Sequence, residues 1–330
     1  MKNKLFTFAK IAVSLGLIAY VFSKVPVDEV AASLRAANPW WILLAFVFYL
    51  AAVATNGVKW LVLLRAQQVN VPFRIVLQYM FVGSFFNNVL PANIGGDVMR
   101  GYGMARYTDR TAQAAVSVVL DRFIGLIAYM ATAAVMSIVL VVFLGQNSLR
   151  WLEGLAFISL AAIGGTLAFM LSRRLRRVIS RFFQWRLLQP FAPMYEGVSS
   201  AFEAYRFEYV ALIKAFVIAL VGLMLTNLVN WLLFHATGAD VPLAYVMLFN
   251  PLIALVLLVP ISVGGLGVIQ RAYPFFYGMA GVPAAQAVAV SVLMSFIVII
   301  ASLPGGVLWL RMRRASDEDN PPVAAGQPTS

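Results

Sequence analysis

Several ionisable side chains stand inside stretches of sequence that are otherwise almost entirely apolar. They are Lys59, Asp97, Arg100, Asp121, Arg122, Lys214 and Arg271. A charge at the centre of a bilayer costs about 2.5–3.5 kcal/mol on insertion scales, so each of these residues needs a partner or a purpose there. Guanidinium groups in such a setting bind anions, and a carboxylate neutralises a cation or carries a proton.

The first of two glycine-rich breaks supplies a candidate anion site. The apolar stretch 75–90 runs into Pro91-Ala92-Asn93-Ile94-Gly95-Gly96-Asp97, and Arg100 follows on the same helical face as Asp97. If Gly95 and Gly96 open the second half of a broken helix, its free amides point into a cavity and Asp97 caps them. A phosphate could then bind there, with charge from Arg100 and orientation from the amides. The alternative is a self-contained Asp97–Arg100 pair at a cytoplasmic helix end.

The second break has the same spacing as the first. The apolar stretch 244–260 continues as Pro260-Ile261-Ser262-Val263-Gly264-Gly265-Leu266-Gly267. Arg271 lies one helical turn after Gly267, on the same face. We therefore expect Arg100 and Arg271 to line one anion-binding cavity from the two breaks.

Asp121 and Arg122 are adjacent, so they project from different faces of a helix and each needs a partner elsewhere. We predict that Asp121 faces Arg100 or Lys59, and that Arg122 faces Asp97. Two simpler alternatives stay open. Lys59 could extend its ammonium group to the interface, and Asn227 and Asn230, on a later helix, could serve only in helix–helix hydrogen bonds.

Composition limits the other chemistry that this chain can perform. It has no cysteine and one histidine, which removes disulfides, thiolate nucleophiles and multi-histidine metal centres. It has no Gly-x-x-x-x-Gly-Lys-Ser/Thr loop for nucleotide phosphates. We therefore predict no catalytic residue, no metal site and no cofactor. The net charge of +12 does not indicate nucleic-acid binding, because no soluble basic fold is present to display it.

The elements that must position these residues are membrane-spanning helices. The chain of 330 residues is 62% hydrophobic and 12% charged, with a mean hydropathy of +0.86. A soluble domain carries about 25% charged residues. We predict an all-α polytopic membrane protein with two broken helical hairpins and about six full spans. The spans are expected at 5–23, 40–64, 113–144, 151–172, 208–236 and 284–310.

The charge distribution favours re-entrant paths for both broken segments. With the amino terminus inside and each segment returning to the side it entered, the outer side receives only Lys24, Arg35 and Arg150 among the basic residues. Both termini are then cytoplasmic. Broken segments that enter from opposite sides are the sequence trace of an inverted repeat with a midplane site. The alternative is that Pro and Gly merely kink two ordinary transmembrane helices.

The remaining segments are peripheral to this membrane domain, which we place at 1–311. Residues 26–37 form an amphipathic helix at the outer interface. The segment 173–206 is a cytoplasmic linker whose first part, 173–188, has an apolar face among six arginines. It either rests on the anionic inner leaflet or only fixes topology. Residues 312–330 are expected to be a disordered cytoplasmic tail.

The motifs resemble those of one family. The run Phe86-Asn87-Asn88-Val89-Leu90-Pro91, the Gly95-Gly96-Asp97 step with Arg100, the Asp121-Arg122 pair and the second glycine motif resemble the membrane region of lysylphosphatidylglycerol synthases, also called multiple peptide resistance factors. Stand-alone members are described as flippase-like. The resemblance implies that lipid moves between leaflets, and the chain has no room for the cytosolic synthase domain after its last helix.

The leading hypothesis is therefore a lipid translocase of the cytoplasmic (inner) membrane. The headgroup passes through a midplane cavity while the acyl chains stay in the bilayer. Its partners would be an anionic phospholipid or a polyprenyl- or hopanoid-type lipid and, by extension, a lipid-synthesis enzyme. The alternatives are a lipid-linked glycosyl or phosphoryl transferase and a scaffold for such an enzyme. The candidate substrate-binding residues are Lys59, Asn88, Pro91, Asn93, Gly95, Gly96, Asp97, Arg100, Asp121, Arg122, Pro260, Gly264, Gly265, Gly267 and Arg271.

Overall fold

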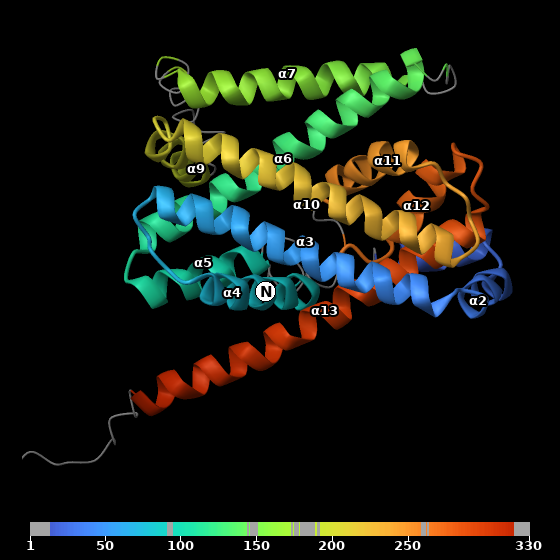
Figure 1. The fold of residues 1–330 in the computed structure, drawn as a ribbon, viewed down its shortest axis with the longest axis horizontal. Helices are drawn as coiled ribbons and strands as arrows, with labels where there is room; N and C mark the ends of the chain where they lie inside the picture. The colour runs from blue at the N-terminus through green and yellow to red at the C-terminus, as the bar shows by residue number, and fades with distance from the viewer. Residues whose placement is uncertain are drawn as a thin grey trace, which may run out of the picture.

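The computed structural model describes residues 14–90, 95–143, 145, 151–172, 174, 178, 189, 192–258, 262 and 264–319. No strand occurs in these residues, so the predicted all-α class is confirmed. The helical stretch Ser14–Lys24 precedes the labelled helices of Figure 1. These are α2 (Val27–Arg35), α3 (Pro39–Ala66), α4 (Phe73–Val89), α5 (Gly95–Thr108), α6 (Thr111–Ile138), α7 (Trp151–Leu171), α9 (Ala192–Ala204), α10 (Tyr209–Ala236), α11 (Leu243–Val256), α12 (Val268–Gly278) and α13 (Ala284–Asp319).

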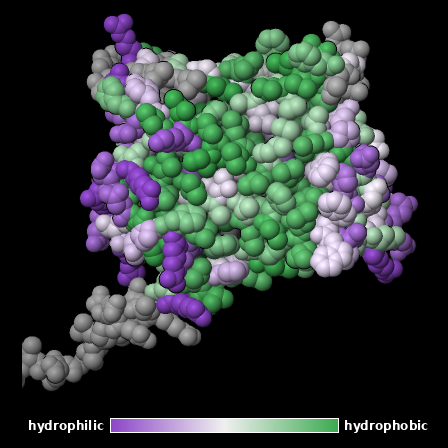
Figure 2. Space-filling model, viewed as in Figure 1, coloured by the Kyte–Doolittle hydropathy of each residue, from purple (hydrophilic) through white to green (hydrophobic). Residues whose placement is uncertain are grey.

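Four helices of the described chain are long and apolar enough to cross a membrane. They are α3, α6 with its π-helical extension Val139–Phe143, α10, and α13 as far as Met312. A spanning helix needs about 20 apolar residues, and each of these exceeds that length. In the space-filling view, hydrophilic residues gather mainly at the left and right margins, with an apolar band between them (Figure 2). The expected spans 5–23 and 151–172 correspond in the described residues to the shorter Ser14–Lys24 stretch and to α7.

The centre of the fold is an antiparallel pair of helices, α3 and α10 (Figure 1). At one end of the pair, the Asn38 amide, just before α3, donates to the Ala236 carbonyl oxygen, the last of α10, at 2.9 Å. At the other end, the Tyr205 hydroxyl donates to the Leu63 carbonyl oxygen at 2.7 Å. Burial raises the pKa of Tyr205, so its phenol remains a hydrogen-bond donor. Polar contacts thus fix the register of the pair at both ends.

The two halves of the chain repeat the same order of elements around this pair. Helices α3 and α10 are each 28 residues long. The connecting segments 67–72 and 237–242 are equal in length, and each ends on Val-Pro before the next helix begins. A broken helix pair follows in each half, then a long helix. Because α3 and α10 run antiparallel, the halves are inverted relative to each other, as the glycine motifs predicted.

Both predicted breaks are present, and they meet. Helix α4 ends at Val89 and α5 begins at Gly95, while α11 ends at Val256 and α12 begins at Val268. In Figure 1 the α4–α5 pair and the α11–α12 pair lie toward opposite ends of α3 and α10. A Cβ atom on Gly264, which has φ +56°, would lie 3.5 Å from the Asn88 carbonyl oxygen. The second break therefore contacts the end of α4.

Helix α5 packs back against α4 through glycine. A Cβ atom built on Gly96 would lie 2.0 Å from the Gly83 carbonyl oxygen, a backbone atom that cannot move aside alone. Only glycine at position 96 permits this approach of the two helices.

We therefore expect Gly96→Ala to lower the free energy of unfolding by about 1–3 kcal/mol, the usual cost of overpacking. The measurement is the midpoint of unfolding in detergent micelles. The matched control is Gly101→Ala on the same helix, where a Cβ would lie 3.4 Å from a Val118 methyl carbon. That control gains helix propensity and should be neutral or stabilising. Equal effects of the two substitutions would contradict the proposed close packing.

The peripheral predictions have mixed outcomes. Residues 27–35 form α2, as expected for the amphipathic segment. Helix α13 continues to Asp319, eight residues into the stretch that composition assigned to a disordered tail, because the apolar helix simply extends into a polar last turn. Residues 320–330 and most of the linker stretch 173–188 lie outside the described residues.

Candidate functional site

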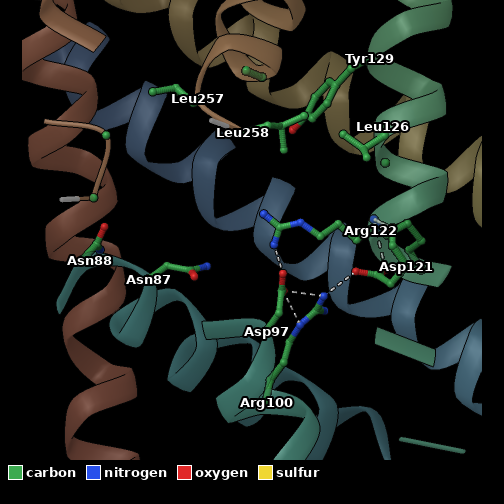
Figure 3. A pocket seen from close by; sticks show the side chains of 15 residues that line it. Asn87, Asn88, Asp97, Arg100, Asp121, Arg122, Leu126, Tyr129, Leu257 and Leu258 are labelled. Carbon is green, nitrogen blue, oxygen red and sulfur yellow. Dashed lines mark hydrogen bonds and ion pairs between the residues drawn. The ribbon is translucent and has the colours of Figure 1, made fainter. Parts of the chain in front are cut away.

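Five ionisable side chains converge where the two breaks meet. Lys59 comes from α3. Asp97 and Arg100 come from α5, and Asp121 and Arg122 from α6 (Figure 3). We call the space that they line the charged cavity. Its two connected parts have volumes of about 370 and 380 Å³ and share Asn87, Asp97, Arg100, Asp121 and Tyr129 in their walls. Gly264 and Gly265 of the second break complete the wall of the first of these parts, which also contains Asn88 and Arg122.

The predicted ion pairs are confirmed. Arg100 Nη2 lies 2.8 Å from Asp121 Oδ2 and 2.9 Å from Asp97 Oδ1. Lys59 Nζ lies 3.2 Å from Asp121 Oδ1, and Arg122 pairs with Asp97 Oδ2. Each carboxylate thus bridges two cations, and Arg100 is shared by both. The alternative of a self-contained Asp97–Arg100 pair is wrong, because Asp121 from α6 completes the coordination of Arg100.

Lys59, Arg100 and Asp121 are each only 5% exposed. The alternative in which Lys59 extends to the interface is therefore wrong, since its ammonium group is held by Asp121 in the interior. Trp60 lies under Arg100, with the guanidinium carbon 4.9 Å from its ring centroid, and its indole N–H donates to Ser117. This stacking limits the orientation of the guanidinium group.

The start of α5 is capped differently from the prediction. The Gly96 amide donates to Asn87 Oδ1 at 2.9 Å, so Asn87 of α4 provides the cap that we expected from Asp97. The physical reason is that Asp97 lies on the side of α5 that faces Arg100 and Arg122, where an ion pair to two cations is stronger than a cap. Asn87 also bridges the break and holds α4 against α5.

The cavity carries an excess of positive charge. Among the described residues of its wall, three side chains are cationic and two are carboxylates. An internal cluster that is one negative charge short attracts an anion, because a charge left uncompensated in a low-dielectric site is costly. In the described part of the chain, no group of three or more His, Asp or Glu could ligate a metal ion.

Comparison with known proteins agrees with this architecture. The family described as the lysylphosphatidylglycerol synthase TM region matches residues 7–306 of the chain. The chain belongs to this family. Its relatives include a UPF0104 membrane protein of Methanothermobacter thermautotrophicus, 25% identical over 83% of this chain and 86% of the relative. A UPF0104 membrane protein of Pyrococcus horikoshii is 23% identical over 83% of this chain and 88% of the relative.

Membership of this family confirms the resemblance that the two glycine motifs and the Asp-Arg step indicated, and with the apolar helices it supports a multi-pass membrane protein. The family match covers both inverted halves of the fold. The motif residues Asn88, Gly264 and Gly265 lie in the cavity wall, as predicted. Pro91, Asn93 and Pro260 lie outside the described residues. Gly95 begins α5 beside Leu90.

Arg271 is not part of the charged cavity. Its side chain is exposed, and its guanidinium carbon lies 5.4 Å from the ring centroid of Tyr20. Gly267, one turn earlier on the same face, packs against the Ser14–Lys24 helix, where a Cβ would lie 2.8 Å from Leu17. Gly267 and Arg271 do lie on one face of the helix, as predicted, but that face contacts the Ser14–Lys24 helix. The expectation that Arg100 and Arg271 line one cavity is wrong.

Several residues of the cavity wall were not selected from the sequence. Tyr129 lies two turns after Arg122 on α6, and the i, i+7 spacing places it on the same face. Tyr49 and Asn56 are related in the same way on α3 and line the second part of the cavity. Helical spacing from the charged residues could therefore have identified these wall residues from the sequence. Asn87 is adjacent to Asn88 in the motif, and nothing in the sequence indicated which of the two asparagines would cap α5.

Proposed function

We propose that this protein moves a lipid with an anionic headgroup between the leaflets of the cytoplasmic membrane. The observation that carries the proposal is the buried cluster of three cations and two carboxylates at the meeting point of two inverted helix pairs. A phosphate group would supply the missing negative charge and accept charge-assisted hydrogen bonds from the guanidinium groups. Transporter sites of inverted-repeat proteins lie at such midplane breaks.

The proposed orientation follows from the basic residues. Four arginines lie at one end of the bundle, at the end of α3, the start of α4, the end of α5 and just before α6. They are Arg65, Arg74, Arg106 and Arg110, respectively. The positive-inside rule places that end in the cytoplasm, together with both termini. The α4–α5 pair would then enter from the cytoplasm and the α11–α12 pair from outside. In the family's setting, an enzyme that makes the lipid would be the natural partner, and the substrate would be an anionic phospholipid or a polyprenyl-linked lipid.

The test is reconstitution of the purified protein into phosphatidylcholine vesicles with a trace of fluorescent lipid in both leaflets. Dithionite reduction reports how fast the inner pool reaches the outside. We expect fluorescent phosphatidylglycerol to be exposed faster than in protein-free vesicles and faster than fluorescent phosphatidylethanolamine, because only the former brings a net negative charge to the cavity. No acceleration with any headgroup class would overturn the proposal. A new lipid product detected by mass spectrometry would instead favour an enzyme.

A further inference from the structure

A second space adjoins the charged cavity and differs from it in chemistry. It has a volume of about 470 Å³ and lies between α4, α11, α12 and α13. We call it the apolar chamber. Its apolar wall is formed by Phe85, Val89, Ile253, Ala254, Leu257, Leu266, Ile269, Met294, Val298, Ile299 and Leu303. None of the described residues in its wall is ionisable at neutral pH, in contrast to the charged cavity.

The polar side chains in the chamber wall already bond to other protein groups. Asn88 donates to Ser302, which donates to the Ile299 carbonyl oxygen. Asn250 donates to Asn227 Oδ1 at 2.7 Å, and Tyr273 donates to Asn230. The prediction that Asn227 and Asn230 make interhelical hydrogen bonds is thereby confirmed. Thr226 and Ser295 donate to carbonyl oxygens one turn back on their own helices. With these donors engaged, the surface that the chamber presents suits hydrocarbon.

The chamber adjoins the charged cavity and reaches the protein surface. Asn88, Ala254, Leu257 and Gly264 line both spaces. In Figure 3, Leu257 and Asn88 lie on the side of the pocket opposite Asp121, with Asn87 between Asn88 and the charged side chains. The mouth is formed by apolar side chains that are exposed on the protein surface, namely Val89, Leu266, Ile299 and Leu303. In a bilayer this mouth faces lipid, since exposed residues of this kind belong to the hydrocarbon region.

We propose that the apolar chamber receives one hydrocarbon chain of the lipid whose anionic headgroup lies in the charged cavity. The inference rests on the proposed function, because it takes the occupant of the charged cavity to be a lipid. An amphiphile joins an anionic group to a chain, and the two spaces, which share four wall residues, offer a net-positive site beside an apolar site. The sequence alone predicts that all acyl chains of the lipid stay in the bilayer. The chamber changes this expectation, because the protein would bind one acyl chain.

The test uses a phosphatidylglycerol analogue with a diazirine near the end of one acyl chain, in phosphatidylcholine vesicles that contain the protein. After irradiation, mass spectrometry locates the adducts. We expect them at chamber-wall residues such as Ile253, Leu257, Met294 and Val298, in excess over outward-facing apolar residues such as Phe157 and Val217. Adducts distributed in proportion to outward exposure would overturn the inference.

A variant pair sharpens the test. Val298→Trp fills the chamber and should lower the chamber adducts roughly tenfold, as expected when a new side chain occupies the space of a ligand. Phe296→Trp, on the exposed face of α13, is the matched control and should leave them unchanged. Unchanged chamber adducts in a monodisperse Val298→Trp protein would overturn the inference. A diazirine on the headgroup, expected to label the charged-cavity wall in both variants, shows that the proteins are folded.

The failures of the two proposals are distinguishable. Accelerated phosphatidylglycerol exposure with adducts only on the outer surface would leave the translocase in place and remove the chain site. Chamber adducts without any transport would leave the chain site and remove the translocase.

Discussion

Asp121→Asn is expected to destabilise the protein by about 3–5 kcal/mol, the cost of removing one partner from a buried ion pair. The substitution preserves shape and removes only charge. It leaves Lys59 and Arg100 buried without the carboxylate that lies 3.2 and 2.8 Å from their nitrogen atoms. Arg100 retains Asp97, whereas Lys59 loses the carboxylate that it contacts. The midpoint of SDS-induced unfolding in mixed micelles measures the change.

The double variant Lys59→Met/Asp121→Asn separates charge from shape. It removes the cation that the single variant strands, so we expect it to recover much of the lost stability, as in a double-mutant cycle of residues in contact. Asp109→Asn is the control, because Asp109 is exposed in the turn before α6 and surface changes stay within about 0.5 kcal/mol. A single variant as stable as the control would show that the Asp121 carboxylate does not hold the cluster together.

The pairing of these charges could be predicted from sequence because the membrane leaves few solutions. Each buried charge requires a partner, and the predicted membrane body contains only two acids for its cations. Asp121 and Arg122, being adjacent, must point to different neighbours. These constraints predict that Asp121 faces Arg100 or Lys59 and that Arg122 faces Asp97. In the structure Asp121 contacts both Arg100 and Lys59. The all-helical class and the positions of the two breaks followed similarly from apolar composition and from glycine and proline spacing.

The direction in which a helix face points is harder to predict. The spacing placed Gly267 and Arg271 on one face correctly, yet that face contacts the Ser14–Lys24 helix. Sequence periodicity gives relative positions around one helix, and only tertiary packing decides which neighbour each face meets. The same limit explains Asn87, which caps Gly96 across the break while Asp97 turns to its cations.

The two inverted halves contribute different chemistry to the site. The first half supplies the charges on α3, α5 and α6. The second supplies the glycine turn at Gly264 and Gly265, whose positive φ angles need residues without a side chain, together with Leu257 and Ala254. The buried polar residues of its described part are neutral amides, hydroxyls and phenols. The matching glycine motifs therefore predicted correctly that two breaks form the site. They predicted wrongly that each half contributes a charged residue to it.

Arg122 offers the most direct test of why the cavity carries excess positive charge. Its side chain is 32% exposed, and Asp97 keeps its pair with Arg100 when Arg122 is replaced. A change at this position therefore alters the charge of the cavity while retaining the other ion pairs. Removing one cation leaves two cations and two carboxylates, so the cluster becomes neutral without an anion.

We accordingly expect Arg122→Gln to slow phosphatidylglycerol exposure by roughly ten- to a hundredfold, since a hydrogen bond to a charged group is worth about 1.5–3 kcal/mol. Arg122→Lys keeps the charge without the planar fork and should retain an intermediate rate. The vesicle assay with both headgroups measures these exposure rates. In Arg122→Gln, we expect only a small difference in rate between the anionic and the zwitterionic lipid, and high salt should abolish it. Full activity with unchanged headgroup preference in Arg122→Gln would show that the excess positive charge does not select the lipid.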